Sequence, residues 1–116
     1  MRYWTVALAW AVVAVALPAF AHAFLDHAFP GAGDRLHASP AKLELQFSEE
    51  IVASFSAARV IDRNDISVVA GPAVIHGREL ALPLKKLSPG RYYVSWHAVS
   101  VDTHRTEGKY DFTVMP

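Results

Sequence analysis

Apolar and polar residues alternate one by one along three segments of this chain, residues 42–47, 91–99 and 109–114. Successive side chains of a β-strand point to opposite faces, so this period of two predicts three strands that each bury one face and expose the other. An amphipathic helix would need apolar residues three or four positions apart, which these segments lack. The alternation therefore favours a fold built from strands that cover a common core.

Five further segments are weaker candidates for strands: 23–29, 58–62, 66–69, 74–75 and 79–84. Turn-forming sequences such as Arg63-Asn64-Asp65 and Ser88-Pro89-Gly90 separate the candidates at intervals of roughly 8 to 12 residues, a spacing typical of all-β domains. About seven short strands predict one all-β domain, either an antiparallel Greek-key sandwich or a small Greek-key barrel.

The first 21 residues differ from the rest, because 18 of them are apolar. Arg2 precedes an apolar run over Val6–Leu17, and Ala19-Phe20-Ala21 then forms a small-residue cleavage site. This order is typical of a secretory signal peptide. A permanent membrane anchor is the alternative, but the uninterrupted run is shorter than the roughly 20 residues of a spanning helix. We expect cleavage after Ala21, which leaves 22–116 as an exported periplasmic domain without stable membrane association.

Composition excludes several classes of function. The chain has no Cys, which rules out disulfides, thiolate metal sites and a Cys nucleophile. After the leader, basic and acidic residues nearly balance, so nothing resembles the basic footprint of a nucleic-acid binder. The signatures G-x-S-x-G and G-x-x-x-x-G-K-[ST] are both absent. We therefore do not expect an enzyme.

Histidine is enriched, and all six copies follow the leader. Asp102 and His104 are two residues apart, so in an extended segment both side chains project to one side and could reach one ion. Cleavage after Ala21 would make His22 the first residue, and its α-amine and imidazole could then chelate the same ion. Such nitrogen and oxygen ligands suit Cu(II), whereas Cu(I) prefers thiolate or thioether sulfur, and Met115 is the one Met after the leader.

The remaining histidines carry weaker signals. His27 lies in a candidate strand, His37 in a loop rich in Gly, Ser and Pro, and His76 beside a turn, so each is expected at the surface. The alternation in 91–99 predicts that His97 faces away from the core and that Trp96 is a core anchor.

Residues 22–116 resemble the CopC family of periplasmic copper-resistance proteins. The resemblance rests on four blocks in order: His22-Ala23-Phe24-Leu25, the segment 40–49, Leu87-Ser88-Pro89-Gly90, and the segment 96–104 that leads to Gly108 and Phe112. It implies a cupredoxin-like Greek-key β-barrel that binds one Cu(II) ion and has no established enzymatic activity. By position, His22, Asp102 and His104 match the family's copper ligands. Glu49 matches an acidic residue beside the metal, either a weak axial ligand or a hydrogen-bond partner.

One departure from the family bears on the oxidation state of the copper. Some members have a Met-rich loop with a His that forms a Cu(I) site, whereas the corresponding stretch 60–73 here contains neither residue. The resemblance therefore implies a Cu(II)-only protein, expected to be a monomer, for copper storage, buffering or delivery in copper homeostasis and resistance. The family often operates beside a multi-pass membrane copper importer. We expect such a partner to be a separate protein, because 22–116 holds no second apolar span.

Two other classes of function remain open at the level of sequence. His22 could form the histidine brace of a copper-dependent oxidative enzyme, although the domain leaves little material for a substrate-binding face. The domain could also be a secreted Ig-like interaction module whose histidines are incidental.

Overall fold

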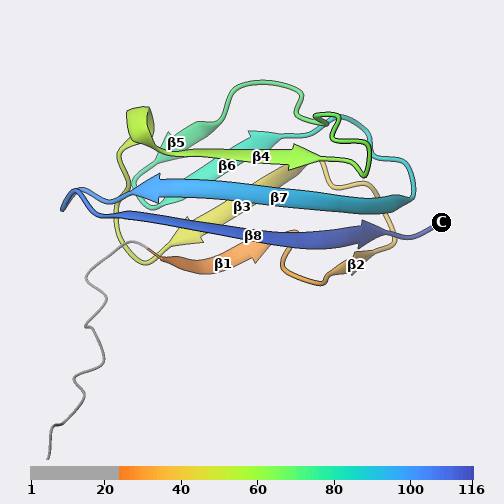
Figure 1. Ribbon diagram of the computed structural model, residues 1–116, viewed down its shortest axis with the longest axis horizontal. Helices are drawn as coiled ribbons and strands as arrows, with labels where there is room; N and C mark the ends of the chain where they lie inside the picture. Colours follow the sequence, from red (N-terminus) through yellow and green to blue (C-terminus); the bar gives the residue numbers. More distant parts are fainter. Residues whose placement is uncertain (1–23) are drawn as a thin grey trace, which may run out of the picture.

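Two four-stranded β-sheets lie face to face in the computed structural model, which describes residues 24–116 (Figure 1). The first sheet has the order β1 (Leu25–Phe29), β3 (Lys42–Phe47), β6 (Glu79–Pro83), β5 (Val74–His76). The second has the order β2 (Arg35–Leu36), β8 (Arg105–Val114), β7 (Gly90–Val99), β4 (Ala57–Ile61). A single 3₁₀ turn, η1 (Ala53–Phe55), precedes β4.

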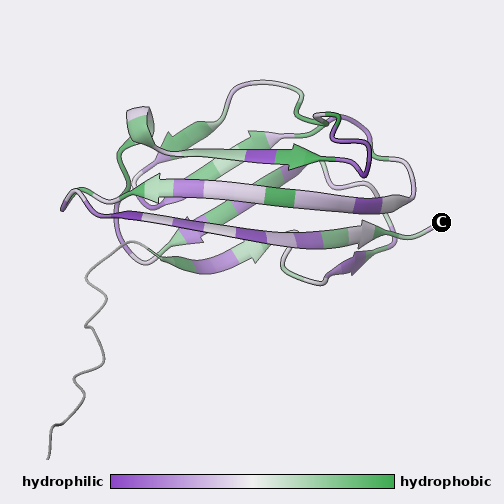
Figure 2. Cartoon of the chain, viewed as in Figure 1, coloured by the Kyte–Doolittle hydropathy of each residue, from purple (hydrophilic) through white to green (hydrophobic). Residues whose placement is uncertain are grey.

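The core fills the space between the sheets, where alternate side chains of both sheets meet. Hydrophilic residues interrupt the hydrophobic ones along the strands (Figure 2), and most of the hydrophobic ones face inward. The strands supply most of the buried apolar side chains: Leu43, Leu45, Phe47, Val60, Leu80, Leu82, Tyr92, Val94, Trp96, Ala98, Phe112 and Val114. Full burial of each large apolar side chain stabilises the fold by roughly 1.5–3 kcal/mol.

Trp96 anchors one end of this core, as the alternation predicts. Its ring lies edge-on to Phe47 of the facing sheet, with the ring centroids 5.2 Å apart. On β8 the residue directly opposite is Gly108. A Cβ atom at that position would lie 2.7 Å from three atoms of the indole ring. The absence of a side chain at Gly108 therefore makes room for the indole.

Two tyrosine hydroxyls tie loops to the sandwich. Tyr110 on β8 donates to the carbonyl of Pro30, which follows β1 in the other sheet, at 2.7 Å. Burial and the nearby Asp34 carboxylate raise the pKa of Tyr110, so the phenol remains a donor. Tyr92 donates to the carbonyl of Ser88 at 2.6 Å and stacks on Phe112.

The strand predictions are largely confirmed. The segment 42–47 is β3, 91–99 lies within β7, and the candidates near 23–29, 58–62, 74–75 and 79–84 correspond to β1, β4, β5 and β6. β8 begins at Arg105, four residues before the predicted strand, because the backbone ladder with β7 continues past the end of the apolar alternation. The sequence did not predict β2, a two-residue strand that pairs in parallel with β8.

Two fold predictions are wrong. The segment 66–69 is not a regular strand: it passes from one sheet to the other and makes only the isolated bridges Ile61↔Ser67 and Val69↔Leu84. The barrel that the family resemblance implies is not formed. The sandwich, the other predicted architecture, is confirmed, since each sheet ends in edge strands, β1 and β5 in one and β2 and β4 in the other. The expected antiparallel pairing holds for every strand pair except β2 with β8.

The tight contact between Gly108 and Trp96 leads to a prediction. Gly108→Ala should lower the free energy of unfolding by about 1–3 kcal/mol, the usual cost of overpacking. This cost of overpacking exceeds the gain in stability of roughly 0.5–1 kcal/mol that is expected when alanine replaces a glycine inside a strand. Urea denaturation would measure the change. Lys109→Ala, on the exposed face of β8, is the control and should stay within about 0.5 kcal/mol of wild type. Equal stability of both variants would contradict this packing.

Candidate metal centre

Residues 100–104 form the tip of the β7–β8 hairpin (Figure 1). The ladder between the two strands runs to the pair Val99↔Arg105. Beyond it, the backbone N–H of Ser100 donates to the carbonyl of His104 at 2.9 Å, and the N–H of Thr103 donates to the carbonyl of Ser100 at 2.8 Å. These bonds close a tight turn, so Asp102 and His104 belong to a turn and not to the extended segment assumed from the sequence.

Asp102 and His104 lie side by side on this turn. Nδ1 of His104 is 3.4 Å from Oδ2 of Asp102, and both side chains are exposed. The structure therefore brings together two of the predicted ligands, one an imidazole nitrogen and the other a carboxylate oxygen.

Several hydrogen bonds stabilise the charged form of Asp102. The hydroxyl of Ser100 donates to Oδ1, and the backbone N–H of His104 approaches the same oxygen at 3.4 Å. The Ser100 hydroxyl is the main cause that lowers the pKa of Asp102, and the backbone and side chain of His104 lower it further. Asp102 therefore stays ionised to a lower pH than an ordinary aspartate, and it offers a negative charge at the surface.

Thr103 adopts an unusual backbone conformation between the two candidate ligands. Its φ is 73°, in the left-handed region that β-branched residues rarely enter. Its N–H bonds to Ser100, and its hydroxyl donates to the carbonyl of Asp102 at 2.5 Å. These local bonds compensate for the strained conformation, which reverses the chain between Asp102 and His104.

Phe24, the first described residue, is fixed at two points to Ser48. The Phe24 N–H donates to Oγ of Ser48 at 3.0 Å, and the N–H of Ser48 donates to the carbonyl of Phe24 at 2.8 Å. Ser48 directly precedes Glu49, which is half-buried in the loop after β3. These bonds, which join residues 24 positions apart, place the start of the domain beside Glu49.

The same loop continues to the hairpin tip. The N–H of Val101 donates to the carbonyl of Glu50 at 3.1 Å, and the N–H of Val52 donates to the carbonyl of Val99 at 2.7 Å. Ile51 also forms a bridge with Ser100. The loop 48–52 therefore contacts both the N-terminal segment at Phe24 and the tip that contains Asp102 and His104.

His22, the remaining predicted ligand, lies outside the described residues. Within residues 24–116, no three side chains of the His, Cys, Asp and Glu types are grouped so that they could hold a metal ion. The described part of the chain also has no helix that is both long and apolar enough to cross a membrane. The proposed leader and its cleavage site are likewise outside the described residues.

The other histidines lie at or near the surface, as predicted. His27, His37 and His76 are exposed, and His97 is half-buried on a strand whose neighbour Trp96 points into the core. Burial of Trp96 confirms its predicted place in the core.

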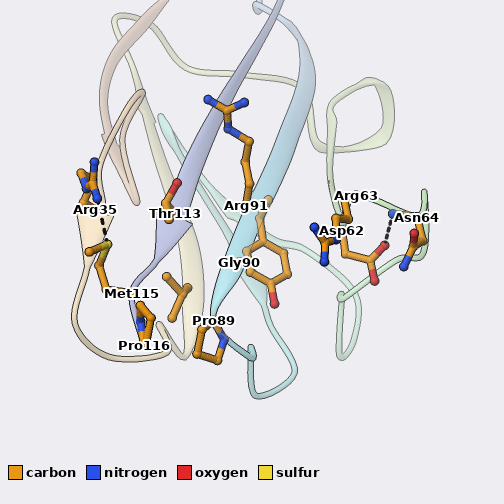
Figure 3. Close-up of a pocket in the computed structure, with 12 residues that line it drawn as sticks. Arg35, Asp62, Arg63, Asn64, Pro89, Gly90, Arg91, Thr113, Met115 and Pro116 are labelled. Carbon is orange, nitrogen blue, oxygen red and sulfur yellow. Dashed lines mark hydrogen bonds between the residues drawn. The ribbon is translucent and has the colours of Figure 1, made fainter.

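The single methionine of residues 24–116 lies at the opposite end of the sandwich. Met115 lines a hollow of about 550 Å³ together with Arg35, Asp62, Arg63 and Arg91 (Figure 3). A guanidinium nitrogen of Arg35 is 3.4 Å from the Met115 sulfur. β7 and β8 run their full length between this hollow and the hairpin tip, so the thioether is remote from Asp102 and His104.

Sequence reasoning missed the residues that organise this region. The bonds between Phe24 and Ser48 leave no local signal, because the two residues are far apart in sequence. Ser100 and Thr103 flank the candidate ligand Asp102, but serine and threonine are common in loops. In the sequence, only their position beside Asp102 indicated that Ser100 and Thr103 belong to the site.

Residues 25–115 match the CopC domain family. The chain belongs to the CopC family. It is 38% identical over 99 residues to Protein YobA of Escherichia coli strain K12, which covers 82% of this chain and 80% of the relative. Its fold is similar to the crystal structure of CopC from Methylosinus trichosporium OB3b, with a TM-score of 0.76, 38% identity, and coverage of 82% and 95% of the two chains.

A second similar structure is PcoC, described as a methionine-rich copper resistance protein from Escherichia coli. It gives a TM-score of 0.71 at 32% identity and covers 81% of this chain and 99% of PcoC.

The left-handed conformation of Thr103 leads to a prediction about the tip. Thr103→Gly should change the free energy of unfolding by less than about 1 kcal/mol, because glycine adopts positive φ readily but also gains freedom in the unfolded chain. Thr103→Pro should destabilise by more than about 1 kcal/mol, since proline cannot reach this φ and lacks the N–H that bonds to Ser100. Urea denaturation of both variants would measure this difference. Equal free energies of unfolding for the glycine and proline variants would contradict the left-handed conformation of Thr103.

Proposed function

We propose that this protein binds one Cu(II) ion per mature chain and acts as a periplasmic copper carrier or buffer in copper homeostasis and resistance. The proposed ligands are the α-amine and imidazole of His22, the carboxylate of Asp102 and the imidazole of His104. Glu49 would lie beside the ion, as a weak axial ligand or a hydrogen-bond partner. Membership of the CopC family supports a copper-binding function.

The two-point attachment of Phe24 to Ser48 is the observation that carries this proposal. His22 is two residues before Phe24, and an extended chain spans at most about 3.3–3.6 Å per residue. His22 therefore has a reach of about 7 Å from the fixed position of Phe24. The loop that holds Phe24 also contacts the hairpin tip through Glu50 and Val101. This arrangement would allow His22 to join ligands that are far away in sequence.

The spacing of Asp102 and His104 is compatible with a shared ion. Two atoms that each lie about 2.0–2.2 Å from one metal ion are roughly 3 Å apart at right angles and roughly 4 Å apart when opposite. The distance of 3.4 Å between Nδ1 of His104 and Oδ2 of Asp102 lies within this range. The carboxylate charge of Asp102 would offset part of the charge of the ion.

The donor atoms favour Cu(II) over Cu(I). The proposed set consists of nitrogen and oxygen, which suit Cu(II) in tetragonal geometry, and Cu(II) forms the strongest complexes of the common divalent ions. Among the described residues, the one thioether belongs to Met115 beside Arg35, remote from the tip. The stretch 60–73, which has neither Met nor His, provides no ligands for a sulfur-rich Cu(I) site. PcoC, by contrast, is described as methionine-rich.

Export would create the metal site. Removal of residues 1–21 frees the amine of His22, so the leader prevents chelation by this amine until the chain has been exported. We propose that the mature domain is monomeric and that it exchanges copper with a separate multi-pass membrane importer. A binding role rather than catalysis agrees with the relatives, of which PcoC is described as a copper resistance protein.

Loss of a single ligand tests the proposed site. His104→Ala should weaken Cu(II) binding by about 100-fold or more, because a lost metal ligand should cost at least as much as the 10- to 100-fold typical of groups that only support ligands. A few residues retained in front of His22 should weaken binding similarly, since they replace the free amine with an amide. Competition titration with a chelator of known affinity would measure both.

The control for this titration is His37→Ala. His37 is exposed and follows β2 at the end of the sandwich opposite the tip, so its loss should leave Cu(II) affinity unchanged. Wild-type affinity in both the His104 variant and the extended protein would refute the proposed ligands.

The affinity for Cu(II) should fall with pH. An α-amine and an imidazole ordinarily have pKa values of about 7.7–8.0 and 6.5, and both must be neutral to bind the ion. Asp102 has a lowered pKa, so its carboxylate stays charged over this range and protonation of the nitrogen ligands governs release. Chelator competition between pH 8 and pH 5 should show a continuous loss of affinity. An affinity independent of pH would exclude an amine and imidazoles as ligands.

A further inference from the structure

Ser100 is buried at the centre of an otherwise exposed turn. Its exposed fraction is 0%, whereas Asp102, Thr103 and His104 are all exposed. Within residues 24–116, the only other buried residue of the polar or charged types is Ser56, which is 9% exposed. Burial of a hydroxyl group is unfavourable unless the group makes hydrogen bonds, so the contacts of Ser100 indicate its role.

Ser100 contacts every residue from Asp102 to His104. Its N–H donates to the carbonyl of His104, and its own carbonyl accepts from the N–H of Thr103. Its hydroxyl has one hydrogen and two candidate acceptors, Oδ1 of Asp102 and the carbonyl oxygen of His104, which is 3.3 Å away. The carboxylate is the stronger acceptor because it is charged. The hydroxyl therefore donates to Asp102.

This bond makes the two oxygens of Asp102 different. Oδ1 accepts from the Ser100 hydroxyl and faces the N–H of His104, whereas Oδ2 faces Nδ1 of the His104 imidazole. A carboxylate on an exposed turn would otherwise rotate freely and present either oxygen. The buried hydroxyl thus selects the oxygen that faces the neighbouring imidazole.

We infer that Ser100 is a positioning residue for the copper site. Its hydroxyl holds Oδ1 of Asp102, so Oδ2 and the imidazole of His104 face the same ion before the ion arrives. Ser100 itself does not contact the metal. This inference rests on the proposed function, because it assigns Asp102 and His104 as ligands.

Ser100→Ala tests the inference, and Ser56→Ala is a matched control. Ser56 is also buried, and its hydroxyl oxygen accepts from the N–H of Val99, the last residue of β7 before the tip, at 3.1 Å. Both variants lose one buried hydroxyl group near the tip, but only Ser100→Ala releases Asp102. We expect Ser100→Ala to weaken Cu(II) binding by about 10- to 100-fold, the range for groups that orient metal ligands, and Ser56→Ala to bind like wild type.

The electron paramagnetic resonance spectrum of bound Cu(II) separates positioning from general stability. Ser100→Ala should change the copper hyperfine splitting, because the carboxylate ligand is no longer fixed. Ser56→Ala should leave the spectrum unchanged, and Ser100→Thr, which keeps the hydroxyl, should restore the wild-type spectrum. An unaltered spectrum and affinity in Ser100→Ala would overturn the inference, as would equal effects in both alanine variants.

Cu(II) titration of His104→Ala and a crystal structure with Cu(II) distinguish failure of the whole site from failure of the role of Ser100. If His104→Ala and the protein extended in front of His22 also bind like wild type, the proposed site fails as a whole. If His104→Ala weakens binding but Ser100→Ala does not, only the role of Ser100 fails. A crystal structure of the wild-type protein with Cu(II) tests the same point without any variant. We expect copper to bind Oδ2 of Asp102 while the Ser100 hydroxyl still donates to Oδ1. Copper bound through Oδ1 of Asp102 would overturn the inference.

Discussion

The ladder between β7 and β8 joins the two central strands of the second sheet and carries the hairpin tip. It pairs ten residues of each strand, from Gly90↔Val114 to Val99↔Arg105. Its inward side chains form much of the core, and its register places Gly108 opposite Trp96, where a larger residue would collide with the indole. The ladder also ends at the tip, so the packing of the core fixes where Asp102 and His104 lie. A slip of one residue would move every inward side chain to solvent.

The candidate site depends on contacts between distant parts of the chain. The loop 48–52 lies between the start of the domain and the hairpin tip, with Phe24 bonded to Ser48 and Val101 bonded to Glu50. β1 follows Phe24, β7 and β8 lead to the tip, and the exposed turn contributes the side chains of the proposed ligands Asp102 and His104. Metal binding at such a site would link the N-terminus to the tip, and this link would exist only after the leader had been removed.

Much of the fold could be predicted from local patterns. The alternation in 42–47 gave the bounds of β3, since one face of that strand is buried and the other is exposed. The pattern did not predict the first four residues of β8, because Gly108 accommodates Trp96 instead of contributing an apolar side chain. It also failed at 66–69, where the carboxylate of Asp62 accepts from the N–H groups of Asn64 and Ile66 and the chain then leaves the sheet. Edge strands, which distinguish a sandwich from a barrel, depend on pairing between distant segments.

The candidate site was predictable to a similar extent. The proximity of Asp102 and His104 follows from their spacing, although the turn that creates it does not. The attachment of Phe24 to Ser48 and the burial of Ser100 arise from tertiary contacts that no local pattern records.

Native mass spectrometry of the exported protein tests the central claim most directly, because one spectrum reports both the first residue and the copper content. We expect a chain that begins at His22 and gains the mass of one copper ion when Cu(II) is added. A chain that begins elsewhere, or a chain that begins at His22 and binds no copper, would contradict it.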